Sequence, residues 1–170
     1  GQYDSAANGL SGLDADLVPS LLIESGTPAI VVPRGGSFDV DALACRDSKV
    51  VVAWKPSRES ARALRACLPW LQSANVVHLA VESADAAGTM WPGAAQVQAW
   101  MRLHGVKAEV RPHEVGHGNA GEALLALSHD VAADLLVMGC FGHSRARELL
   151  LGGASRTVLR EMELPVLMAH

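Results

Sequence analysis

Residues 139–155 read Gly139-Cys-Phe-Gly142-His-Ser-Arg-Ala-Arg-Glu-Leu-Leu-Leu-Gly152-Gly153-Ala154-Ser155. The stretch begins where a short apolar run ends at Met138, and it stops where a helical pattern starts at Ala154. Glycine is favoured where φ must be positive or where the backbone approaches a ligand closely. A strand that leads through glycines into a helix start presents backbone N–H groups and the positive end of the helix dipole, which together bind phosphate. The spacing fits neither GxxxxGKS/T nor GxGxxG, so neither of these phosphate-binding motifs applies.

From residue 49 onward, apolar runs of strand length alternate with stretches of helical periodicity. Ser57 is a natural N-cap for the first helix, and Pro69 should kink or end that helix. Strands separated by helices pair in parallel, and apolar runs without alternation are covered on both faces. The pattern predicts an open α/β sandwich with a mainly parallel five-stranded sheet flanked by helices. We expect strands at residues 50–53, 76–81, 107–111, 135–138 and 166–168, and helices at 57–71, 94–103, 120–131 and 154–162.

The composition suits one domain with a buried sheet. The chain has 170 residues, of which 49% are hydrophobic and 19% charged, and its formal net charge is −4. No basic run stands out, which argues against a nucleic-acid partner or an anionic membrane surface. The apolar stretches have the length of strands, so we expect no membrane span. Three widely spaced cysteines form no readable disulfide framework, and a cytoplasmic location is therefore expected.

The motif Gly-x₂-Gly-x₉-Gly, followed by a helix and a last strand, resembles the nucleotide-binding signature of the universal stress protein family. Residues 49–64 resemble that family's first strand, loop and first helix, and residues 119–126 and 134–139 resemble its third helix and fourth strand. The resemblance covers residues 49–170 and implies an adenine nucleotide alpha hydrolase-like fold. It implies a stress-linked regulatory module that binds ATP or AMP, with Mg²⁺ as an accompanying ion. The sequence shows no Ser-His-Asp order with a nucleophile elbow and no pair of carboxylates that reads as an acid/base dyad, so we expect that the protein is not an enzyme.

The same resemblance implies a ligand site beyond the carboxyl ends of the first and fourth strands. Gly139 and Gly142 would lie against ribose and phosphates, and the backbone N–H groups after Gly152 would cradle the phosphates. The residues implied to bind the nucleotide are Ala53, Lys55, Ser57, Val81, Met138, Gly139, Gly142, His143, Arg145, Gly152, Gly153, Ala154 and Ser155.

Two positions depart from the family pattern. The family often has Ser or Thr directly after the third glycine, where this chain has Gly153, and its nearest hydroxyl is then Ser155. ATP-binding members commonly carry Asp or Asn in the first loop, where this chain has Lys55-Pro56. Lys55 is a candidate for a phosphate-binding cation, for a residue that blocks the pocket, or for a solvated loop lysine. If these positions close the pocket, the alternative function is an interaction or dimerisation module that binds no nucleotide.

The N-terminal segment repeats part of the C-terminal one. Residues 20–32 and 157–169 both read as a helix, a proline and an apolar strand at a constant offset, which indicates a partial repeat. Because two-domain members of the family carry two units in tandem, we interpret residues 1–36 as the helix and strand of a first unit, 37–48 as a linker and 49–170 as the complete domain. We expect residues 29–32 to pair antiparallel with 166–168, within the chain or across a homodimer, because this covers an apolar edge.

A third hypothesis comes from His113-Glu114-Val-Gly-His117, which matches the HExxH pattern of zinc proteases. That chemistry requires both histidines on one face of a helix. Here the motif follows Pro112 and is interrupted by glycines, so we expect it in a loop. Cys140 is interpreted as a small apolar filler in preference to an activated thiol, and His78 as a packed residue within a strand.

Overall fold

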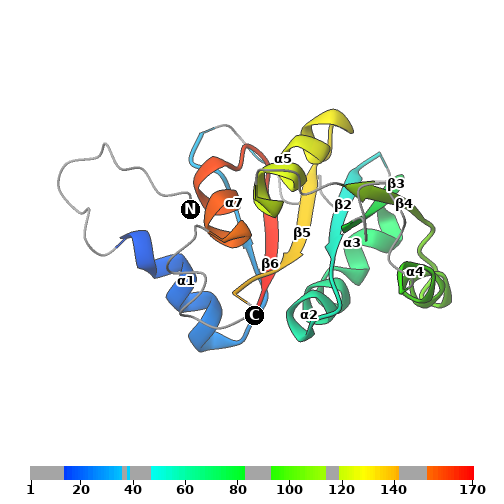
Figure 1. The fold of residues 1–170 in the computed structure, drawn as a ribbon, viewed down its shortest axis with the longest axis horizontal. Coiled ribbons are helices and arrows are strands. Elements are labelled where there is room, and N and C mark those ends of the chain that lie inside the picture. Colours follow the sequence, from blue (N-terminus) through cyan, green and yellow to red (C-terminus); the bar gives the residue numbers. More distant parts are fainter. Residues whose placement is uncertain (1–13, 36–37, 39–46, 83–92, 114–118, 142–152) are drawn as a thin grey trace.

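The computed structural model of the chain describes residues 14–35, 38, 47–82, 93–113, 119–141 and 153–170. Helices and strands alternate along this part of the chain (Figure 1). In chain order they are α1 (Asp14–Ser25), β1 (Ala29–Val31), β2 (Lys49–Trp54), α2 (Arg58–Ala66), α3 (Leu68–Ser73), β3 (Val76–Glu82), α4 (Ala94–Leu103), β4 (Ala108–His113), α5 (Ala120–Asp130), β5 (Leu135–Gly139), α7 (Ala154–Glu161) and β6 (Val166–Ala169).

The described strands form one six-stranded sheet in the order β1-β6-β5-β2-β3-β4. The five strands from β2 to β6 pair in parallel, which confirms the predicted α/β fold with a mainly parallel sheet. The strand β2 lies at the centre, between β5 and β3. The chain therefore builds the sheet outward in two directions from β2, which leaves a crevice at the carboxyl ends of these neighbouring strands.

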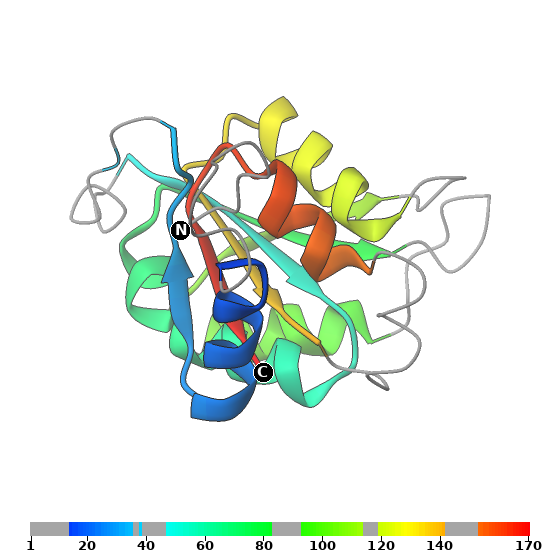
Figure 2. The ribbon, with the colours of Figure 1, turned by 90° about the vertical axis from the view of Figure 1, so that its left-hand side faces the viewer.

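The sixth strand is β1, which pairs antiparallel with β6 in the register Ala29↔Met168, Ile30↔Leu167 and Val31↔Val166. This confirms the expected pairing and shows that it forms within the chain. The pair lies at one side of the molecule with α1 beside it (Figure 2). The apolar edge of β6 is thereby covered, because an exposed strand edge is otherwise free to pair with other chains.

Helices cover both faces of the sheet (Figure 1). One core cluster joins the sheet to α2, α3 and α4, and a second cluster joins the opposite face to α1, α5 and α7. In β2, Val50 and Val52 belong to the first cluster and Val51 to the second, and all three are buried. This burial on both faces explains why the strand sequences are apolar without alternation.

The first helix of the domain is interrupted as Pro69 predicts. Ser57 caps α2, and its Oγ accepts a hydrogen bond from the backbone N–H of Ser60 at 3.1 Å. The helix ends at Ala66, and Pro69 stands in the first turn of α3, where a missing N–H costs no helical hydrogen bond. None of the helices in the described ranges is long and apolar enough to cross a membrane. Most of the expected linker, residues 37–48, lies outside the described residues.

Candidate functional site

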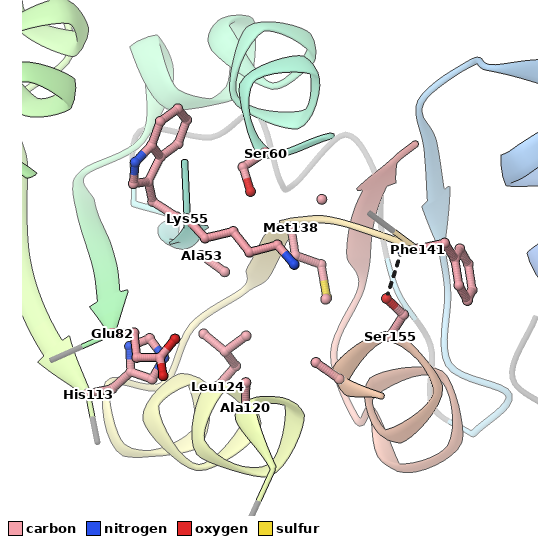
Figure 3. A pocket seen from close by; sticks show the side chains of 13 residues that line it. Ala53, Lys55, Ser60, Glu82, His113, Ala120, Leu124, Met138, Phe141 and Ser155 are labelled. Carbon is pink, nitrogen blue, oxygen red and sulfur yellow. Dashed lines mark hydrogen bonds between the residues drawn. The ribbon is translucent and has the colours of Figure 1, made fainter. Parts of the chain in front are cut away.

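A cavity opens at the carboxyl ends of the central strands (Figure 3). This is the position at which open parallel α/β sheets bind ligands, because the crossovers diverge there. The strand ends form one part of its wall, and all four strands from β2 to β5 take part. They contribute Ala53 and Trp54 from β2, Glu82 from β3, His113 from β4, and Met138 and Gly139 from β5.

The N-terminal parts of three helices form a second part of the described wall, and Lys55 and Phe141, which follow β2 and β5, complete it. Backbone N–H groups in the first turn of a helix have no partner within that helix, and the helix dipole makes this end electropositive. Side chains cap two of these ends, Ser57 on α2 and Asn119 on α5, whereas the uncapped end of α7 leaves its N–H groups available to an anionic ligand. The helical residues that line the cavity are Ser60 of α2, Ala120 and Leu124 of α5, and Ala154 and Ser155 of α7.

The start of α7 is capped by a glycine. No side chain caps this helix at Gly153, and the Gly153 carbonyl accepts from the backbone N–H groups of Arg156 and Thr157. Ser155 is buried, and its Oγ accepts a 3.3 Å hydrogen bond from the backbone N–H of Phe141 (Figure 3). The hydroxyl that the sequence offered for phosphate binding therefore holds the backbone that leaves β5, where Phe141 has a φ of +55°.

Gly139 is required by a close approach between β5 and α2. A Cβ at this position would lie 2.5 Å from the backbone nitrogen of Ser60 and 2.6 Å from the carbonyl carbon of Glu59. No real side chain tolerates these distances, so either the strand or the helix would have to move. The glycine thus brings the N-terminal turn of α2 onto the end of β5, next to the cavity.

Lys55 follows β2 directly and contributes to the cavity wall. Its side chain points into the cavity toward Met138 (Figure 3). Within the described part of the chain, no hydrogen bond or ion pair involves its ammonium group. A cation that faces the cavity without a protein partner is available to a negatively charged ligand.

Glu82 and His113 lie side by side at the ends of the paired strands β3 and β4 (Figure 3). Burial lowers the pKa of His113 below its usual value, although the charge of Glu82 and the backbone of Val81 act in the opposite direction. The neutral imidazole is therefore favoured near pH 7. In the described structure, His113 Nδ1 and Trp54 Nε1 are buried without a hydrogen-bond partner.

Glu59, although it stands in the first turn of α2, is not part of the cavity wall. Burial alone would raise the pKa of this carboxyl. Hydrogen bonds from its own backbone and from Ser57, together with the charges of Arg58 and His170, outweigh burial, so the pKa is lowered. One carboxylate oxygen lies 3.4 Å from the Arg58 guanidinium. This carboxylate stabilises the helix end from within the protein.

About half of the residues that the family resemblance implied to bind the nucleotide line the cavity. Of these, Ala53, Lys55, Met138, Gly139, Ala154 and Ser155 line it, with Gly153 at the adjoining helix cap. Ser57 is the N-cap of α2 and does not line it. Gly142, His143, Arg145 and Gly152 fall outside the described residues.

Val81, which was also expected to bind the nucleotide, is not among the residues that line the cavity. Its side chain packs in the core cluster on the opposite face of the sheet, with Val77 and Leu79. Successive side chains in a strand point to opposite faces, so the next residue, Glu82, faces the cavity in its place. Sequence reasoning missed Trp54, Ser60, Glu82, His113, Ala120, Leu124 and Phe141 as lining residues. Of these residues, only Glu82 could have been expected from the sequence, because it is a charged residue that directly follows a predicted strand.

The HExxH pattern does not begin on a helix. His113 is the last residue of β4, which extends two residues beyond the predicted strand, and it pairs with Glu82 of β3. Glu114 and His117 lie outside the described residues. Among the residues that the structure describes, no group of three or more His, Cys, Asp or Glu side chains is placed to hold a metal ion.

The two described cysteines and His78 are packed residues. Cys140 is 1% exposed in the core cluster that includes α7, as expected for an apolar filler. Burial raises the pKa of the Cys67 thiol to about 12. His78 is buried in β3 beside Glu109 and Arg111.

Asn119 connects the two helix N-termini of α5 and α7. Its Oδ1 accepts hydrogen bonds from the backbone N–H groups of Gly121 and Glu122, and its Nδ2 donates to Thr157 Oγ1 at 3.0 Å. We expect Asn119→Ala to lower the free energy of unfolding by about 1–2 kcal/mol, because a helix cap and a bond between helices are lost. Asn119→Asp keeps the cap and should cost less. Urea unfolding measures both, and an unchanged midpoint for Asn119→Ala would contradict this role.

Comparison with known proteins identifies a family that resembles most of this chain. The model of the universal stress protein family matches residues 48–170. The chain is 46% identical over 63 residues to the universal stress protein Slr1230 of Synechocystis sp., a match that covers 37% of this chain and 21% of that protein.

Solved structures have the same fold. A universal stress protein from Archaeoglobus fulgidus superposes with a TM-score of 0.66 at 21% identity, covering 85% of this chain and 50% of that one. A universal stress protein solved in complex with cAMP gives a TM-score of 0.56 at 26% identity and covers 72% of this chain and 96% of that one. The chain spans about half the length of the Archaeoglobus protein. Since the family model matches well over half of its residues, the chain belongs to the universal stress protein family.

Proposed function

We propose that this protein binds an adenine nucleotide in the cavity at the carboxyl ends of β2 to β5, and that nucleotide occupancy serves a regulatory role in the response to stress. The observation that carries the proposal is the convergence of three helix N-termini and Lys55 on that one cavity. Electropositive helix ends and a lysine suit the phosphate, and the apolar side chains of Leu124 and Met138 suit the base and ribose.

The cAMP complex of a related universal stress protein supports an adenine nucleotide as the ligand class. The proposal includes binding without turnover, so the protein would act through its liganded state. The alternative of a pocket closed by Lys55 is tested by the same titration as the proposal, because this exposed residue directs its side chain into the cavity (Figure 3).

A calorimetric titration of the purified chain with AMP and ATP tests the proposal. Ala154→Glu places a carboxylate at the first residue of α7, inside the cavity wall, and should abolish measurable binding through bulk and charge repulsion. The matched control is Ala95→Glu, an exposed residue in the first turn of α4 that does not line the cavity. We expect the control to bind as the wild type does. Absence of binding by a folded wild-type chain would refute the proposed function.

A further inference from the structure

Lys55 is an exposed residue whose side chain reaches into the cavity. The ammonium group is the one cationic side chain in the described wall of the cavity, and Figure 3 shows it directed inward toward Met138. Lys55 directly follows Trp54, the last residue of the central strand β2, which pairs with Val81 of β3. A lysine in this position supplies a point charge to an oxyanion.

Two of the three acidic side chains near the cavity contact other protein groups. Glu59 faces Arg58 and Ser57 outside the wall, and the Glu122 carboxylate accepts a 2.9 Å hydrogen bond from Asn119. Glu82 reaches the cavity but stands beside His113 on the side formed by β3 and β4. Mg²⁺ is typically held between phosphate oxygens and one or two protein carboxylates. Near Met138, the described wall presents the ammonium group of Lys55, whereas its one carboxylate, Glu82, lies beside His113 (Figure 3).

Resting on the proposed function, we propose that Lys55 takes the role of a divalent cation, so that the protein binds an adenosine monophosphate without Mg²⁺. The charge balance fits this ligand class. On the side of the cavity away from Glu82 (Figure 3), Lys55 and the uncapped N-terminus of α7 supply about +1.5 charges, which offsets the roughly −1.5 to −2 charges of a phosphate monoester at neutral pH. A triphosphate carries more negative charge than these groups can offset, and it ordinarily arrives with its metal ion.

Titration with AMP and with ATP, in buffer containing excess MgCl₂ and in buffer containing excess EDTA, separates the possible results. We expect the affinity for AMP to agree within about twofold between the two buffers, and to exceed the affinity for ATP when EDTA is present. Binding of AMP only in the presence of Mg²⁺ would overturn the inference while leaving the proposed function intact. Absence of AMP and ATP binding in both buffers would refute the proposed function itself.

Variants of Lys55 test the residue. Lys55→Met keeps the length and the apolar stem, and it should weaken AMP binding about tenfold in both buffers because a charge-assisted contact is lost. Lys55→Arg keeps the charge and should recover most of the affinity. Lys107→Met, at an exposed lysine just before β4 and outside the cavity wall, is the matched control and should bind as the wild type does. Unchanged AMP affinity in Lys55→Met would overturn the proposed role of this lysine.

Discussion

Gly139→Ala is expected to lower the free energy of unfolding by about 1–3 kcal/mol, the usual cost of forcing a methyl group into a closely packed site. The added Cβ would meet backbone atoms of Glu59 and Ser60 at 2.5–2.6 Å, and backbone cannot rotate away as a flexible side chain can. Either β5 must shift from its neighbours or the first turn of α2 must lift off the sheet. Urea denaturation followed by circular dichroism measures the change in midpoint.

The same substitution should also weaken nucleotide binding, because Gly139 and Ser60 both line the cavity. Gly35→Ala is the matched control. A Cβ at Gly35 would meet nothing within 4 Å, so its effect should stay within about 0.5 kcal/mol of the wild type. A Gly139→Ala protein with the wild-type midpoint would show that β5 and α2 do not approach as closely as described.

Local sequence patterns predicted most of the elements of this fold. Three predicted elements agree with the structure to within one residue at each end. They are the strands at 135–138 and 166–168, which correspond to β5 and β6, and the helix at 94–103, which corresponds to α4. Each of these segments is bounded by a charged residue, a glycine or a proline, and such local boundaries can be read without knowing the tertiary structure. The pairing of β1 with β6 was predictable for a further reason, since a short apolar strand must cover its edges.

The orientation of side chains at the end of β3 could not be predicted in the same way. The segment Val76-Val-His-Leu-Ala-Val81 is apolar at nearly every position because both faces of the strand are covered. Alternation between polar and apolar residues is the signal that identifies which face a residue occupies, and here it is missing. The family resemblance named Val81, whereas the side chain that reaches the cavity is that of Glu82.

The reason for Gly139 was likewise outside the reach of a local pattern. A glycine motif was interpreted as an approach of the backbone to ribose and phosphate. The structure shows that Gly139 also permits contact with α2, which lies far away in the sequence. Contacts of this kind depend on how helices pack on the sheet, so one sequence alone does not distinguish a glycine required by packing from a glycine required by a ligand.

Leu136→Ala should destabilise the protein by about 2–5 kcal/mol, the range found when a fully buried leucine is truncated and a cavity remains. Leu136 is 0% exposed in the middle of β5, where it is paired with Val51 of β2 on one side and Val166 of β6 on the other. Because neighbouring strands fix its backbone on both sides, the core has little freedom to collapse into the space. At about 2–4 °C per kcal/mol for a chain of this size, the melting temperature should fall by roughly 4–20 °C.

Leu103→Ala provides the comparison, since it removes the same atoms from a side chain that is 85% exposed at the end of α4. Its effect should stay within about 0.5 kcal/mol, because those atoms are already in water before unfolding. The difference between the two variants isolates burial from any intrinsic preference for leucine. Equal melting temperatures for the two variants would contradict the position of β5 inside the sheet, between β6 and β2. They would also contradict the placement of the cavity, because β5 contributes Met138 and Gly139 to the cavity wall. Addition of saturating AMP should raise the melting temperature of the folded Leu136→Ala protein, because a ligand that binds only the native state stabilises it by mass action.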